Sequence, residues 1–161
     1  MTFQEGLKQV EKATHKIVEA NNMITEATMD AFLFTWKWWI ALAMLIIPWV
    51  VWAIFRKKES SARLMFAAFF VMIFSSTLDS IGVDNGNWYY PLKVIPLPTI
   101  SYSYRYSLLP VIIMFLIQIK PNFNPFIKAV LFGAVSAFVG MPILTALDMY
   151  KKIDWAPLIL F

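Results

Sequence analysis

Residues 38–55 read WWIALAMLIIPWVVWAIF, a stretch that carries no charged side chain. A helix needs about 20 mostly apolar residues to cross the hydrocarbon core of a bilayer. Trp36, Trp38 and Trp39 lie together at the start of this stretch, and tryptophan prefers the interface between membrane and water. Pro48 removes a backbone hydrogen-bond donor and predicts a bend. The stretch therefore predicts a transmembrane helix.

Three further apolar stretches follow, at residues 64–83, 106–119 and 129–147. The second of these three is short and has Pro110 near its start, so we expect a short or partly re-entrant helix there. Hydrophobic residues make up 60% of the 161 residues and charged residues 15%, with a mean hydropathy of +0.63. The predicted fold is all-α, a polytopic transmembrane helix bundle of four spans within a domain of residues 31–161.

The last seven residues, 155–161, are again mostly apolar. Seven residues are too few to cross a bilayer. Two interpretations stay open for them: a tail that rests at the membrane interface, or the truncated beginning of a fifth span.

Residues 1–30 are polar but carry a regular apolar stripe. Its members follow each other at spacings that place them on one side of a helix; they are Phe3, Leu7, Val10, Ile17, Ile24 and Ala31. We therefore expect an amphipathic helix about 40 Å long. Its apolar side needs a partner, which could be the membrane surface, the rim of its own bundle or a second copy of the chain. Polar residues at Thr14, Asn21 and Thr28 weaken a coiled coil.

The short loops predict the orientation. Residues 56–63 carry four basic side chains and residues 120–128 carry two, and basic loops stay on the cytoplasmic side. The chain is accordingly expected to be a multi-pass protein of the cell membrane with its N-terminus outside the cytoplasm. Four basic residues fall on the outer side and disagree with this rule: Lys93, Arg105, Lys151 and Lys152.

Composition argues against several other classes of protein. The formal net charge is +4, but the basic residues gather in loops beside apolar stretches, so nucleic-acid binding is not expected. The chain has no cysteine and one histidine, His15, and neither a metal-ligand spacing nor a phosphate-binding loop occurs. We expect no cofactor, no metal site and no enzymatic activity.

A few polar and aromatic residues remain as candidates for function. Asp79 lies near the end of the second span, where an unpaired charge would be costly, so we expect either an ion pair with Arg105, a helix cap, or a site for a proton or ion. Trp88 and Tyr90 belong to an aromatic outer loop that suits an interfacial belt or a ligand pocket. Gln118 is a further polar residue of the third span.

Small residues in the fourth span predict close helix packing. Gly133 with Ala137, and Ser136 with Gly140, form two pairs four residues apart. Such pairs allow two helix backbones to approach closely in a membrane.

The order of several short motifs resembles a family of uncharacterised small multi-span membrane proteins from spore-forming Gram-positive bacteria of the Bacillus and Clostridium kind. The resemblance covers residues 32–143. Its motifs here are Pro48-Trp49, Arg56-Lys57-Lys58, Asp79, Gly82, Trp88, Tyr90-Pro91, Pro96, Leu109-Pro110, Gln118, Lys120-Pro121 and Lys128. The resemblance implies a five-helix polytopic protein and no particular activity. The chain departs from the family at Arg105, where the family has an acidic residue, and in its reduced tail at residues 155–158.

The function predicted from these features is that of a non-enzymatic scaffold or accessory subunit of a membrane assembly. Its expected partners are the lipid bilayer and either further copies of the chain or other membrane subunits. Two alternatives stay open: an oligomeric channel or transporter whose path uses Asp79, and a sensor whose outer aromatic loop binds a small molecule.

Overall fold

The computed structural model describes residues 1–95 and 101–153, and it is mostly helical, at 78%. The α-helices are α1 (Phe3–Ala27), α2 (Trp36–Phe55), α3 (Ser61–Asp84), α4 (Leu109–Gln118), α5 (Pro125–Val135) and α6 (Met141–Ala146). Short π-helical segments are η1 (Thr28–Phe32), η3 (Tyr104–Leu108) and η4 (Ser136–Gly140), and η2 (Lys58–Ser60) is a 3-10 turn. The tail at residues 155–161, with its two interpretations, lies outside the described residues.

Three helices among the described residues are long and apolar enough to cross a membrane: Trp36–Phe55, Lys58–Asp84 and Pro125–Ala146. The apolar helix Tyr104–Gln118, formed by η3 and α4, is shorter. At 1.5 Å per residue it extends about 22 Å, less than the hydrocarbon thickness of about 30 Å. The prediction of a short helix here is therefore confirmed, and a bundle of four full spans is not.

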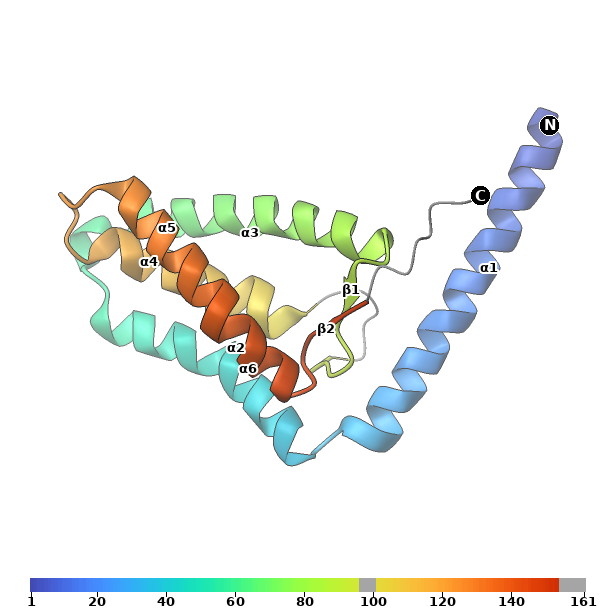
Figure 1. The fold of residues 1–161 in the computed structure, drawn as a ribbon, viewed down its shortest axis with the longest axis horizontal. Coiled ribbons are helices and arrows are strands. Elements are labelled where there is room, and N and C mark those ends of the chain that lie inside the picture. Colours follow the sequence, from blue (N-terminus) through green and yellow to red (C-terminus); the bar gives the residue numbers. More distant parts are fainter. Residues whose placement is uncertain (96–100, 154–161) are drawn as a thin grey trace.

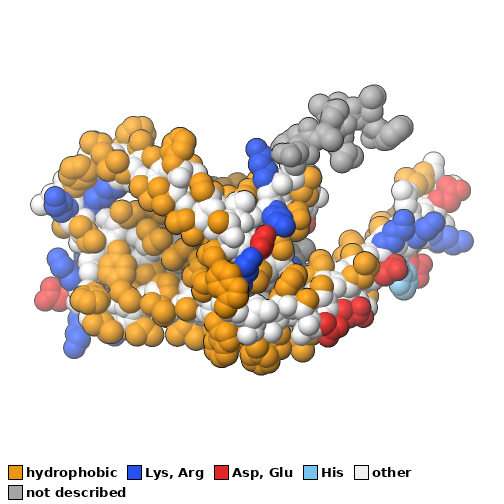
Figure 2. All heavy atoms as spheres, turned by 60° about the horizontal axis from the view of Figure 1, so that its bottom comes forward, with side chains coloured by type: hydrophobic (Ala, Val, Ile, Leu, Met, Phe, Trp, Pro, Cys, Tyr) orange, Lys and Arg blue, Asp and Glu red, His pale blue; other side chains and the backbone are white. Residues whose placement is uncertain are grey.

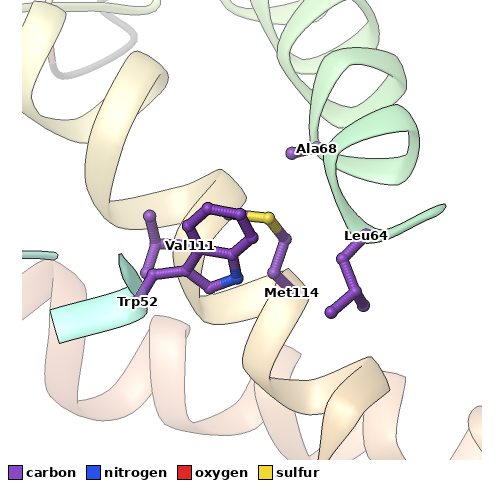
Figure 3. Packing of buried hydrophobic residues seen from close by; sticks show 5 residues of the cluster. All are labelled: Trp52, Leu64, Ala68, Val111 and Met114. Atoms are coloured by element: carbon purple, nitrogen blue, oxygen red, sulfur yellow. The ribbon is translucent and has the colours of Figure 1, made fainter. Parts of the chain in front are cut away.

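The helices α2, α3 and α4 meet in one apolar cluster (Figure 3). Trp52 comes from α2, Leu64 and Ala68 from α3, and Val111 and Met114 from α4. Met114 and Ala68 have no exposed surface. The short helix α4 thus packs between the two longer ones. This packing stabilises it, because a helix of this length is only marginally stable by itself.

A second apolar cluster lies at the opposite end of these helices. Its buried members are Ala41 of α2, Leu92, Leu144 of α6, and Met149. Only 6% of the most apolar part of Pro125–Ala146 is buried inside the chain, against 11% for each of the other two long helices. Hydrophobic side chains therefore cover the outer faces of the bundle, while charged side chains gather at its end and along α1 (Figure 2).

The helix α1 begins with a capping box, in which the Thr2 side chain accepts from the Glu5 backbone N–H and the Glu5 carboxylate accepts from the Thr2 N–H. None of its residues is buried. It extends away from the bundle and runs across the direction of α2 and α3 (Figure 1). The amphipathic helix therefore has the expected extent, but it does not lie along the rim of its own bundle.

A small two-stranded antiparallel sheet, which the sequence analysis did not predict, accompanies the helices. The strand β1 (Trp88–Tyr89) pairs with β2 (Lys151–Lys152), with Trp88 opposite Lys152 and Tyr89 opposite Lys151. Strands of two residues have no alternation of apolar and polar side chains that a sequence could reveal. The sheet matters because it joins the loop that follows α3 to the segment that follows α6.

The two pairs of small residues in the fourth span have different surroundings in the described part of the chain. A Cβ added at Gly133 would meet no atom within 4 Å, and Ala137 is exposed. Ser136 and Gly140 are half-buried and line an apolar groove beside α4. The pair Gly133 and Ala137 is therefore exposed, whereas the pair Ser136 and Gly140 faces the groove beside α4.

Candidate functional site

Asp79 is the centre of a polar cluster near the end of α3. Its Oδ1 accepts hydrogen bonds from Trp88 Nε1, at 2.8 Å, and from the Tyr90 hydroxyl. Its Oδ2 forms an ion pair with Arg105. Of the alternatives that the sequence left open for Asp79, the structure contains the ion pair with Arg105. Trp88 and Tyr90 turn their polar atoms inward to Asp79, which an interfacial belt does not explain.

The ion pair lies largely inside the protein. The Arg105 side chain is 4% exposed and that of Asp79 is 18% exposed. Arg105 Nε and the Ser107 hydroxyl are buried and have no hydrogen-bond partner in the described part of the chain. Charge pairing and two neutral donors thus stabilise the carboxylate, whereas the buried Nε–H of the guanidinium is not used as a donor within the described residues.

Gly82 allows Trp88 to reach Asp79. A Cβ at position 82 would overlap the six-membered ring of Trp88, so the indole lies directly on the backbone of α3. Gly86 follows with φ +70°, a conformation that glycine adopts without strain, and turns the chain from α3 toward β1. The spacing of these two glycines brings the loop back over the last turns of the helix.

The segment η3 places Arg105 and Ser107 toward the protein interior. Pro110 has no N–H to donate to the Tyr106 carbonyl four residues earlier. Trp49 Nε1 of α2 donates to that carbonyl instead, at 3.0 Å. Nearby, the Ser103 hydroxyl donates to the Ala41 carbonyl at 2.7 Å. Two hydrogen bonds to α2 therefore hold the irregular segment that carries Arg105, and π-helical turns of this kind occur often at functional sites.

A cavity of about 280 Å³ lies beside the polar cluster. Four aromatic side chains contribute to its wall, together with Asp79 and two serines. The rest of the wall is apolar and comes from α2, α6 and the adjoining loops. The aromatic residues are Trp88, Tyr90, Tyr104 and Tyr150. Tyr150 approaches both Trp88 and Tyr90, with ring centroids 6.5 and 6.0 Å apart.

Burial and the carboxylate affect the tyrosines outside the spans. The pKa of Tyr90 is raised well above its usual value, first by burial and then by its hydrogen bond to Asp79. The pKa of Tyr150 is also raised, by burial and by the charge of Asp79. Both phenols therefore stay protonated at physiological pH and can donate hydrogen bonds.

Gln118 lies apart from this cluster, at the opposite end of the helices. Its side-chain amide donates to the Phe55 carbonyl at 2.9 Å, and its oxygen accepts from the Lys57 backbone N–H at 3.0 Å. The residue thus ties the end of α4 to the end of α2. The structure does not bring Gln118 together with Asp79, and the same is true of the small residues of α5 and η4.

Two of the basic residues that disagree with the orientation rule are buried. Arg105 is 3% exposed and paired with Asp79, and Lys93 is 5% exposed. Burial lowers the pKa of Lys93. The rule applies to charges in loops that face the aqueous phase. These two residues therefore carry less weight in predicting the orientation than Lys151 and Lys152, which are exposed.

Sequence reasoning missed Tyr150 and Tyr104 as members of the site. Tyr150 follows α6, about sixty positions after Tyr90, and only the pairing of β1 with β2 brings them together. Tyr104 belongs to the alternating tyrosines of residues 102–106, but no signal in the sequence separates it from the tyrosines on either side.

Comparisons with protein-family models, with curated proteins and with solved structures give no match. The class of protein is therefore inferred from the structure itself. The described residues form a mostly helical chain with three helices that are compatible with a membrane protein. The resemblance to small multi-span proteins of spore-forming bacteria stays a prediction from the sequence.

Proposed function

We propose that this chain is a non-enzymatic scaffold or accessory subunit of an assembly in the cell membrane. The observation that carries the proposal is how little of its long apolar helices is buried: 6% to 11% of the most apolar part of each lies inside the chain. The helix α1 adds a second unpartnered surface, because none of its residues is buried. Such surfaces suit contacts with lipid and with further subunits together.

The small-residue face of α5 and η4 supports protein partners in addition to lipid. Gly133 and Ala137 are exposed, and helices in membranes associate where small side chains let the backbones approach. Large side chains, such as Phe126 and Phe138, cover other parts of the same helical run. The backbone of a partner helix could therefore approach most closely along the small residues.

Replacing Ala137 by leucine tests this face. We expect Ala137→Leu to reduce the assembled fraction several-fold in the native membrane, measured by single-molecule photobleaching or chemical cross-linking, because the larger side chain separates the backbones. Ala146→Leu is the matched control, since Ala146 is also exposed and lies at the end of α6, outside the two small-residue pairs. Equal assembly of Ala137→Leu, Ala146→Leu and the unchanged protein would contradict the use of this face.

A second candidate function is the sensing of a small molecule, and the cavity beside Asp79 favours it. Its volume of about 280 Å³ is near the lower limit for ligand pockets. Aromatic rings offer contacts to aromatic or cationic groups, and the hydroxyls of Tyr104 and Tyr150 make no hydrogen bond within the described residues. The channel alternative gains less support, because Asp79 is already paired with Arg105.

Tyrosine substitutions test the cavity. Benzyltrimethylammonium and benzyl alcohol serve as a cationic and a neutral aromatic probe, and binding is measured by isothermal titration calorimetry. We expect saturable binding of at least one probe, weakened several-fold by Tyr150→Phe, since this change removes a free hydroxyl and keeps the ring. Tyr106→Phe is the control, because Tyr106 does not line the cavity. Absence of saturable binding, or equal weakening by both changes, would count against a sensor.

A further inference from the structure

The N-terminal segment, which comprises α1 and the start of η1, divides into two parts of opposite charge. Residues 1–16 carry three lysines and two glutamates, whereas residues 17–30 carry three acidic residues and no lysine or arginine. The acidic residues of the second part are Glu19, Glu26 and Asp30. Two copies of such a helix attract each other when they lie side by side in opposite directions, and repel each other at the acidic ends when they run in the same direction.

The alternative partner, a membrane surface, fits this charge pattern less well. Helices that lie in the interface carry lysine and arginine on the polar side, because the lipid head groups of the cytoplasmic leaflet and of bacterial membranes are partly anionic. In α1 and the adjoining η1 the acidic residues outnumber the lysines. The apolar stripe is nevertheless exposed along its length, as shown by Phe3 at 80%, Val10 at 66% and Ile17 at 60%.

The direction of α1 in the molecule determines how two α1 helices can pair when a two-fold axis relates two copies of the chain. Copies of a membrane protein that insert with the same orientation can be related by a two-fold axis only if that axis is parallel to the membrane normal. The long apolar helices are the elements that would cross the membrane, and α1 runs across the direction of α2 and α3 (Figure 1). A helix that lies across a two-fold axis meets its symmetry copy in the opposite direction. The two-fold symmetry and the charge pattern therefore both favour antiparallel pairing of two α1 helices.

We propose that α1 pairs in an antiparallel arrangement with α1 of a second copy of this chain. The inference rests on the proposed assembly function and names the contact that α1 makes in it. Small residues recur every seven positions beside the apolar stripe, at Gly6, Ala13, Ala20 and Ala27. When the row of small residues on one α1 faces the same row on the second copy, Gly6 lies opposite Ala27 of the second copy. Ala13 then lies opposite Ala20 of the second copy. Lys12 and Lys16 then lie within one turn of Glu19 of the second copy.

Cysteine cross-linking in the native membrane tests the pairing directly, because the chain contains no cysteine of its own. Gly6→Cys and Ala27→Cys are produced separately and also together in one cell. We expect a disulfide-linked dimer mainly in the mixed sample. His15→Cys, on the opposite side of α1, is the control. A dimer in each single variant alone would show parallel pairing, and no dimer above the His15→Cys level would show that α1 has another partner. Either result overturns the proposal.

Charge exchange supplies a second readout. Lys12→Glu together with Lys16→Glu is expected to reduce the mixed dimer several-fold, and adding Glu19→Lys in the same chain is expected to restore part of it. Failure of the proposal can be distinguished from failure of the assembly function. If α1 does not cross-link but Ala137→Leu still reduces assembly, only the α1 pairing is wrong, whereas a monomeric protein would contradict both.

Discussion

Replacing Arg105 by methionine is expected to cost about 3–5 kcal/mol of unfolding free energy, because it leaves the Asp79 carboxylate without its counter-charge in a largely buried position. Trp88 and Tyr90 would still donate to Asp79, but neutral donors do not replace a positive charge. Reversible unfolding in bicelles or mixed micelles measures the loss.

The double substitution Asp79→Asn with Arg105→Met tests whether the loss of stability comes from the unpaired carboxylate. The asparagine oxygen can still accept from Trp88 and Tyr90, and neither member of the buried ion pair remains. We expect the double variant to regain most of the lost stability, so that the two changes are strongly non-additive. If Arg105→Met alone had a negligible effect, or if the double variant were as unstable as the sum of the two single ones, the ion pair would not hold the site together.

Gly82→Ala is expected to have the second large effect, about 3 kcal/mol or more, because the added methyl group would overlap the Trp88 ring. The indole must move, which breaks its hydrogen bond to Asp79 and disturbs β1. Unfolding free energy and the near-ultraviolet circular dichroism of the tryptophans report these two consequences.

Gly133→Ala is the matched control for this prediction. Both glycines lie in long apolar helices, but a Cβ at Gly133 meets no atom within 4 Å. The substitution should therefore be neutral, or stabilising by up to about 1 kcal/mol through helix propensity. Equal destabilisation by the two alanines would contradict the close approach of Trp88 to α3.

The apolar helices can be predicted from composition alone, because an uncharged stretch of sufficient length has few alternatives. The boundaries agree well: the uncharged stretch covers residues 38–55, and α2 covers Trp36–Phe55. The proline in this stretch does not end the helix, which continues through Pro48. The shorter third helix can also be anticipated, since Pro110 and nearby polar residues limit its apolar length.

The site can be predicted only in part. A buried carboxylate requires a partner, and this physical need alone points from Asp79 to Arg105. A pocket at the aromatic loop is one of the two interpretations of Trp88 and Tyr90, but its complete wall cannot be predicted, because it includes Tyr150, which the pairing of β1 with β2 brings to the site. The small-residue pairs predict a contact that is typical of membrane helices, but a sequence does not say whether the partner helix belongs to the same chain.

Weighing the intact particle tests the proposed assembly function most directly. The protein is extracted from its native membrane into lipid nanodiscs, without a detergent step that separates subunits, and its mass is measured by native mass spectrometry. The proposal predicts a particle with two or more copies of the chain, or with other membrane subunits bound to it. A particle containing a single copy of the chain and lipid alone would contradict it.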